Sequence, residues 1–208
     1  MKKVVLLTLS GFLLAGCDST PAGSERPDFD GSIADGQLPW THSRFDAGSD
    51  KFTFAVHSDL TGGERDGIYE VAIAQLNLLR PEFIINVGDL IEGDSDETVV
   101  DQQWDSFDER ADKARAPLFY VAGNHDRTGE MMQAVWDRRL GHGYYHFRYK
   151  DTLFLVLDTE DNTAERMREI HEMRQAALVF AANDEWDKFR ETPYANMPEN
   201  QGGNITAA

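Results

Sequence analysis

The sequence predicts an α/β fold in which short strands alternate with helices and the last two strands form a hairpin. Two observations support this. Apolar runs with strand-like composition alternate with segments whose apolar residues recur every three or four positions. Near the end of the pattern, Lys150-Asp151 separates two strand-like runs, as a hairpin turn does. The expected product is a layered sheet flanked by helices.

Order is expected to begin near Lys51. Residues 52–57 have the aromatic and β-branched composition of a strand. A helix should follow, because apolar residues then recur at helical spacing, and Pro81 should stop it. Its predicted apolar stripe is Ile68, Ala72, Leu76 and Leu79.

The next strand, residues 83–87, is almost entirely apolar, which is typical of a central parallel strand covered on both faces. A third strand is predicted at 117–122, and a hairpin at 144–149 and 152–157. The two intervening helices should bury one face each. The predicted buried residues are Val100, Trp104, Phe107 and Ala111 in the first, and Met132, Val135 and Trp136 in the second.

Residues 1–17 are typical of an export signal, with a basic start, an apolar stretch and small residues before Cys17. The stretch is too short for a membrane-spanning helix, which needs about 20 residues. Its end, residues 14–17, resembles the lipobox of bacterial lipoproteins, which implies lipidation of Cys17; the alternative is an ordinary signal peptide with a chance cysteine. Asp18 favours the inner membrane in enterobacterial lipoproteins. We therefore expect a lipid-anchored protein of the bacterial cell envelope that faces the periplasm.

Residues 18–50 predict a flexible tether, because their apolar residues come singly, although Trp40 or Phe45 could dock on the folded part. The formal net charge of −17 becomes −19 once Lys2 and Lys3 leave with residues 1–16. Such a field repels phosphate backbones, so nucleic acid is not an expected partner. A single cysteine excludes an intrachain disulfide framework.

Polar residues follow each of the three predicted parallel strands. Asp59 follows the first, Asp89 the second, and Asn124 with His125 the third. Ligands bind beyond the carboxyl ends of strands in open α/β sheets, so these side chains should share one rim. Carboxylate, amide and imidazole donors suit Mn, Fe or Zn, and two such ions about 4 Å apart can clamp a phosphoryl group. Taken singly, each residue could instead be a turn or cap residue.

Three motifs, at residues 59–61, 88–92 and 123–126, resemble the first three motifs of the calcineurin-like metallophosphoesterases. The order and spacing agree over about residues 52–158. The resemblance implies a β-sandwich flanked by helices, with two divalent metal ions and a small phosphate-ester substrate. It does not indicate the identity of the metals, the type of ester or the oligomeric state.

The same resemblance assigns roles to individual residues. Asp59 would bind the first metal, Asp89 would bridge both metals, and Asn124 would bind the second. His125 would act beside the phosphate as a general acid or transition-state stabiliser, oriented by Asp126. An imidazole beside a carboxylate can indeed be held in one tautomer and kept protonated.

The motifs depart from the family at Thr61, where a metal-binding histidine is usual. Residues 61–64 spell a capping box, which favours a helix start, and holding a metal-bound water is the weaker alternative for Thr61. His57 could replace the missing ligand because it shares a strand face with Asp59. A satisfied core histidine is the favoured interpretation.

Later family ligands come from a lone histidine and a Gly-His-x-His motif. After Asp158 the chain offers only His171, in an acidic helical segment at 159–208 where a surface position is expected. We therefore expect the α/β domain at 51–158 to be a first half, with an unpaired sheet edge and no second sheet over one face. Two functions follow as alternatives: a metal-dependent phosphoesterase, or a non-catalytic truncated or degenerate lipoprotein of the same fold.

Overall fold

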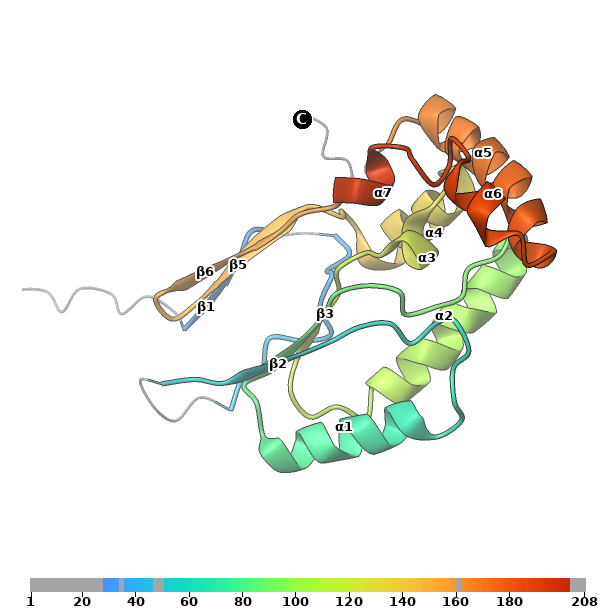
Figure 1. Cartoon of the computed structure of the whole chain (residues 1–208). Coiled ribbons are helices and arrows are strands. Elements are labelled where there is room, and N and C mark those ends of the chain that lie inside the picture. Colours follow the sequence, from blue (N-terminus) through green and yellow to red (C-terminus); the bar gives the residue numbers. More distant parts are fainter. Residues whose placement is uncertain (1–27, 34–35, 47–50, 160–161, 203–208) are drawn as a thin grey trace, which may run out of the picture.

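Two three-stranded sheets pack face to face, and a layer of helices covers one of them (Figure 1). The computed structural model describes residues 28–33, 36–46, 51–159 and 162–202. The predicted signal segment and Cys17 lie outside the described residues. The layered α/β architecture with a β-sandwich is as the sequence predicts.

The first sheet is parallel, in the order β2-β3-β4, with β2 at Phe54–His57, β3 at Phe83–Asn86 and β4 at Leu118–Phe119. The second is antiparallel, in the order β1-β5-β6. Its strands are β1 (Phe29–Gly31), β5 (Tyr145–Tyr149) and β6 (Thr152–Val156). The predicted hairpin is therefore β5–β6, and β3 is the central strand that its apolar composition indicated.

The helices fall into a covering layer and a projecting group. The covering helices are α1 (Ile68–Leu79), α2 (Glu97–Ala111) and α4 (Glu130–Leu140), with the single-turn α3 (Asn124–Arg127) before α4. The projecting helices are α5 (Ala164–Ala182), α6 (Trp186–Arg190) and α7 (Glu199–Gly202). No helix among the described residues is long and apolar enough to cross a membrane.

An aromatic layer joins the two sheets. Phe119 of β4 stacks on Phe147 of β5 with ring centroids 4.0 Å apart, and Phe83 of β3 meets Phe147 edge-on at 5.6 Å. All three side chains are fully buried. The second sheet thus covers one face of the first, so the expectation that this cover is missing is wrong. The strand β1, supplied from the amino-terminal side, completes the second sheet.

The tether prediction is also wrong for the described residues between 28 and 46. Phe29–Gly31 pairs with β5, and Trp40 is only 5% exposed, with its ring 5.7 Å from that of Phe119. Phe45 packs on Tyr149 at 4.8 Å. These apolar residues come singly because each one docks separately on a distant strand, and a local pattern does not reveal such long-range pairing.

The helical layer packs on the other face of the parallel sheet. In α2 the four predicted residues, from Val100 to Ala111, are all buried, and α4 buries Met132, Val135 and Trp136 as predicted. The stripe predicted for α1 is only partly right, because Leu76 packs against the core but Ala72 is exposed. Tyr69 and Ile73 are buried while Ile68 and Leu79 are exposed, because the Tyr69 ring packs on Phe107 at 5.4 Å.

The predicted capping box at residues 61–64 is not formed. Helix α1 begins at Ile68 with Gly67 in the left-handed region as its N-cap, and Glu64 pairs instead with Arg110 of α2. Thr61 therefore lies in the loop between β2 and α1.

Each sheet ends in a strand with exposed apolar side chains. Phe54 and Val56 on β2 are 44% and 56% exposed, and Leu153 and Leu155 on β6 are 57% and 65% exposed. Within the described residues β2 and β6 pair on one side only, as expected of an unpaired edge.

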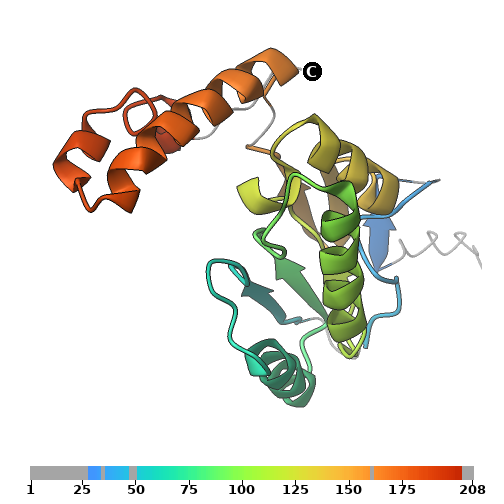
Figure 2. The same cartoon turned by 90° about the vertical axis from the view of Figure 1, so that its right-hand side faces the viewer.

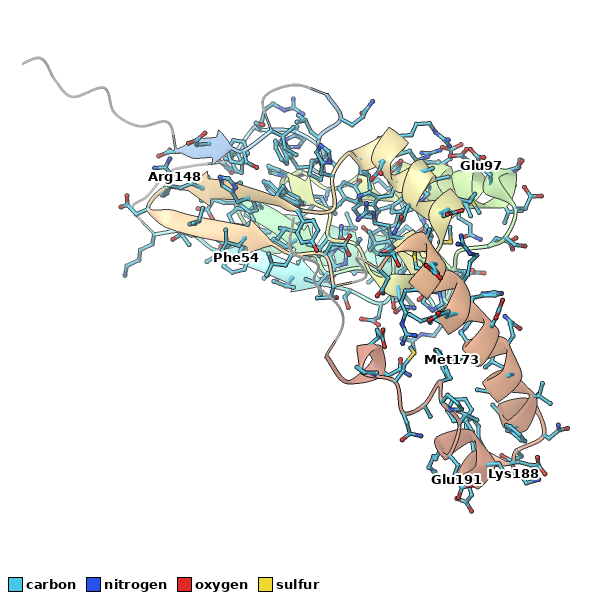
Figure 3. All side chains as sticks on the ribbon, turned by 90° about the horizontal axis from the view of Figure 1, so that it is seen from above. Phe54, Glu97, Arg148, Met173, Lys188 and Glu191 are labelled. Atoms are coloured by element: carbon cyan, nitrogen blue, oxygen red, sulfur yellow. The ribbon has the colours of Figure 1, made fainter. Side chains whose placement is uncertain are left out.

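The acidic segment is helical as predicted, and α5 with α6 stands beside the body of the fold (Figure 2). Its far end, near Lys188 and Glu191, is remote from the sheet end at Phe54 and Arg148 (Figure 3). Its near end is attached to α4. Met167 is buried and its sulfur accepts the Gly129 N–H at 3.3 Å, while Arg168 pairs with Glu130.

Candidate active site

The ends of the parallel strands bring the predicted loops to one edge of the sheet. The N–H of Asp59 donates to Gly88 O at 3.1 Å, and the N–H of Leu60 donates to Asp89 O at 2.8 Å. The loops after β2 and β3 therefore run side by side. This follows from the parallel pairing of β2 with β3, which places both carboxyl ends at the same edge.

Asp59 and Asp89 share an unusual backbone conformation. Their φ angles are 58° and 56°, in the left-handed region that non-glycine residues seldom occupy. Aspartate tolerates it better than most residues, and such strain often marks functional loops. Gly88 has a φ of 95° and must be glycine, since a Cβ there would lie 2.4 Å from Gly123 N.

The carboxylate of Asp126 holds two of these loops together. It is fully buried and accepts the N–H groups of Asp89 and Leu90 after β3, at 2.7 and 2.8 Å, and that of Gly123 after β4, at 2.8 Å. Burial raises the pKa of Asp126 to about 6, and the backbone donors, Ile91 N–H included, oppose that rise. Asp126 is thus the clamp between the second and third motifs.

The imidazole of His125 takes its orientation from another group. Its Nδ1 lies 2.8 Å from the carbonyl oxygen of Glu92. A carbonyl only accepts, so Nδ1 carries the hydrogen and Nε2 is left for a ligand. The expectation that Asp126 orients the ring is therefore wrong in its direct form, because the four backbone donors already occupy that carboxylate.

The loops that carry the predicted site residues meet at this edge through backbone and side-chain contacts. Asp89 Oδ1 accepts the His125 N–H at 3.0 Å, and a Cβ on Gly123 would come within 2.3 Å of the same oxygen. Asp59 is exposed, and its carboxylate accepts the hydroxyl of Ser58. Asn124 is exposed at the start of α3, where its carbonyl accepts the Thr128 N–H at 3.3 Å. Asp59, Asp89, Asn124 and His125 therefore lie along one edge.

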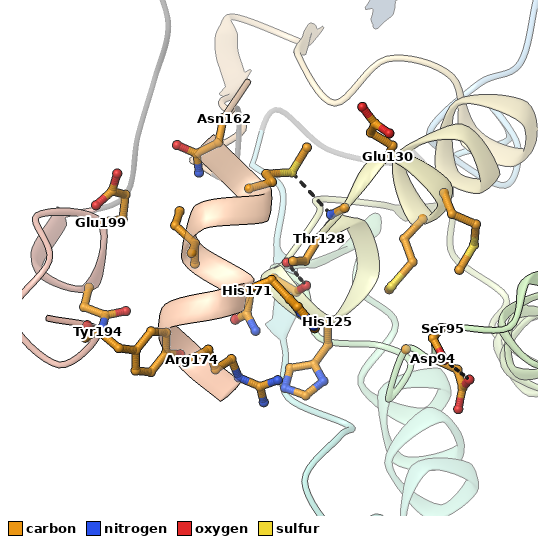
Figure 4. Close-up of a pocket in the computed structure, with 18 of the residues that line it drawn as sticks. Asp94, Ser95, His125, Thr128, Glu130, Asn162, His171, Arg174, Tyr194 and Glu199 are labelled. Carbon is orange, nitrogen blue, oxygen red and sulfur yellow. Dashed lines mark hydrogen bonds between the residues drawn. The ribbon is translucent and has the colours of Figure 1, made fainter. Parts of the chain in front are cut away.

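A pocket of about 820 Å³ opens beside this edge (Figure 4). Its walls are the loop at 92–95 with α3 and the start of α4 on one side, and the α5–α7 segment on the other. Asn124 and His125 line it, whereas Asp59 and Asp89 do not. The helical segment contributes His171 and Arg174, so His171, though exposed, faces the candidate site and not open solvent alone.

The family model for calcineurin-like phosphoesterases matches residues 52–198. The chain belongs to this family. No curated protein matched the chain. The match to the calcineurin-like phosphoesterases extends beyond the three motifs and includes α5 and α6, which the resemblance in the sequence did not reach.

The family typically depends on two metal ions, and the donors present here fit that requirement only in part. Asp59, Asp89 and Asn124 offer carboxylate and amide oxygens on one rim, which is suitable chemistry for a divalent ion. Within the described ranges, however, no group of three His, Cys, Asp or Glu side chains is placed to hold a metal. Thr61, at the position of a usual family ligand, is half-buried.

His57 does not take the place of the missing ligand. Its ring packs edge-on against Tyr69 at 5.7 Å, in the helical layer, and burial lowers its pKa. Its buried Nε2 has no hydrogen-bond partner among the described residues. His57 lies against the core as predicted, but, within the described part of the chain, its side chain does not have the hydrogen-bond partner at Nε2 that the prediction assumed.

Sequence reasoning missed two contributors to the edge. Glu92 supplies the carbonyl that orients His125, and its Oε1 accepts the Gly62 N–H at 2.7 Å, which joins the loops after β2 and β3. The second is the pocket face of α5. Its signal was present, because Met167, Ile170, His171 and Arg174 recur at three- and four-residue spacing.

Proposed function

We propose that this member of the family hydrolyses a small phosphate ester in a metal-dependent reaction at the strand-end rim. The observation that carries the proposal is the Asp126 clamp, which fixes Asp89 against the backbone of His125, and His125 lines a pocket. Burying a carboxylate is energetically unfavourable, and a simple turn does not need one that accepts four backbone N–H groups. Such a carboxylate is expected where two loops must hold functional side chains at fixed relative positions.

In this proposal Asp59, Asp89 and Asn124 would hold the divalent ions, of the Mn, Fe or Zn kind. Bound there, the ions would supply positive charge to the phosphate oxygens and lower the pKa of an attacking water. His125 keeps its Nδ1 hydrogen on Glu92 O, so as a general acid it would act in the doubly protonated form, giving the Nε2 proton to the leaving oxygen and remaining as the neutral imidazole. Glu92 and Asp126 act as positioning residues.

The test is hydrolysis of an aryl phosphate diester by the full chain with added Mn. Activity should require the metal and be lost on Asp89→Asn. Asp151→Asn is the matched control, because Asp151 is exposed in the β5–β6 turn far along the chain from the motifs. Loss of activity in both variants, or in neither, would contradict the assignment.

The second candidate is a non-catalytic protein that keeps the fold. It is favoured by the absence of a three-residue metal cluster among the described residues and by Thr61. Calorimetric titration with Mn and Zn separates the two candidates. Binding that disappears in Asp89→Asn supports the enzyme, and no binding together with no turnover supports the non-catalytic protein.

The proposal includes a place for the protein in the cell. Residues 14–17 support lipidation of Cys17, which would anchor the chain to the bacterial envelope facing the periplasm. Cys17→Ser should abolish incorporation of labelled palmitate and release the protein from the membrane fraction. Unchanged labelling and fractionation would contradict the anchor.

A further inference from the structure

The face of α5 that lines the pocket carries both apolar and basic side chains. Met167 and Ile170 are followed by His171 and Arg174, all on one side of the helix. Figure 4 shows the guanidinium of Arg174 directed toward the imidazole of His125 from the opposite wall. The pocket thus has a basic end where the helical segment faces the third motif.

Of the four acidic residues that line the pocket, two are paired with arginines, and the other two lie on the wall opposite α5 and accept backbone N–H groups. Glu130 pairs with Arg168, and Glu199 pairs with Arg166. Glu92 Oε1 accepts the Gly62 N–H, and Asp94 Oδ1 accepts the Asp96 N–H at 2.9 Å.

Arg174 differs from the other arginines of its helix. Arg166 and Arg168 both form ion pairs, whereas Arg174 forms none within the described residues. An arginine that faces a histidine and forms no ion pair with a described carboxylate is available to bind an anion at this end of the pocket. A planar guanidinium matches two phosphate oxygens at once, which makes phosphate the anion that it suits best.

Apolar side chains form one part of the remaining pocket wall, beside polar residues such as Asn162 and Asn200. Met131, Met132, Met167, Ile170 and Met197 line it together with the ring of Tyr194. Methionine side chains adapt to flat or irregular apolar groups. The volume of about 820 Å³ is that of a small-molecule site, with space for more than a phosphate.

We propose that Arg174, assisted by His171, binds the phosphate group of the substrate, and that the esterified group is apolar or aromatic and lies against the methionine wall. This inference rests on the proposed phosphoesterase function and names the substrate class of that site. The near end of α5 is fixed by the Met167 and Arg168 contacts with the α4 region, so the helix can present Arg174 at a constant position.

The test compares Arg174→Gln and Arg174→Lys with Arg190→Gln, all in the full chain. Arg190 lies on α6, is exposed and, among the described residues, pairs only with Asp187 three positions away, so its replacement removes the same charge without touching the pocket. The probe is inorganic phosphate, titrated calorimetrically in the metal-free chain and with Mn. Kinetics on 1-naphthyl phosphate and glycerol phosphate give KM and kcat separately.

In Arg174→Gln the Kd for inorganic phosphate and the KM should rise about tenfold to a hundredfold, as expected for the loss of a charge-assisted contact, with a smaller change in kcat. Arg174→Lys should recover part of the loss, and Arg190→Gln should equal the wild type. The KM of the wild type should be lower for the naphthyl ester than for glycerol phosphate.

The possible failures are distinguishable. Hydrolysis with the same KM and phosphate Kd in Arg174→Gln overturns the inference and leaves the proposed function standing. Phosphate binding that depends on Arg174 without any hydrolysis supports the inference and overturns the proposed function. Absence of phosphate binding in the wild type, or preference for glycerol phosphate, overturns the inference.

Discussion

Asp126 shows how one buried residue can organise a candidate site without touching a substrate. Its carboxylate draws the backbone of the second and third motifs together, and the position of Asp89 and His125 depends on it. The sequence placed Asp126 in the motif but suggested a direct contact with His125. The sequence shows an aspartate shortly after a strand in either case. It does not show whether that aspartate contacts an imidazole or four backbone N–H groups, because this depends on the tertiary structure.

Replacement of Asp126 by Asn should therefore destabilise the fold. An amide offers one acceptor oxygen and turns an NH2 group toward backbone donors, so we expect a loss of about 2–4 kcal/mol in the free energy of unfolding. Urea unfolding in metal-free buffer measures it. Asp137→Asn, on exposed α4 surface, is the control and should change stability by about 0.5 kcal/mol or less. Equal effects of the two variants would contradict the clamp.

At the scale of elements, the predictions were correct where the buried residues of a helix or strand are plainly apolar in the sequence. In α2 the four buried residues are apolar and the residues next to them in the sequence are mostly polar, so all four were predicted. In α1 the burial of Tyr69 was missed because its hydroxyl gives it a polar character, although its ring fills the space beside Phe107. The three parallel strands were visible in the sequence, but β4 is only two residues long, shorter than the predicted 117–122.

The α2 helix also carries a group that should make stability depend on pH. Burial raises the pKa of Asp108 to about 6, against the opposing effects of Arg139 and Tyr120. The folded state then holds this proton more tightly than the unfolded state, so the contribution of Asp108 to stability is greatest in acid and is lost as the pH rises through about 6.

Asp108→Asn removes this titration. The stability of the variant relative to the wild type should increase as the pH is raised from 4 to 7, when both are followed by urea unfolding. Asp105→Asn, a more exposed neighbour that also contacts Arg139, serves as the control. A difference between Asp108→Asn and wild type that stays constant across this range would refute the pH dependence.

At the scale of the whole molecule, the second sheet and its amino-terminal strand are what the sequence concealed. The residues around Trp40 have no period, since each packs on a strand more than seventy positions further along the chain. Such contacts leave no local sequence pattern, so the composition of this segment was interpreted as that of a flexible tether. The same limit applies to the pocket, because the approach of α5 to the third motif is a tertiary contact between distant segments.

Trp40→Ala tests whether this amino-terminal segment is part of the fold. The indole lies between the rings of Phe29, Phe119 and Tyr145, so its removal should cost about 3–5 kcal/mol in the free energy of unfolding. Leu38→Ala, at a site that is 37% exposed, should cost far less. Chemical denaturation followed by circular dichroism measures both. A tether would give no loss for either variant.

The most direct test of the central claim is a double-mutant cycle on turnover of an aryl phosphate ester in the presence of Mn. The variants are Asp59→Asn, Asp89→Asn and the double variant of the full chain. Because residues that serve one site act as a unit, each single change should remove most of the activity and the double change should remove no more than the worse single one. No turnover by the wild type, or losses that simply multiply, would contradict a single functional rim at the ends of β2 and β3.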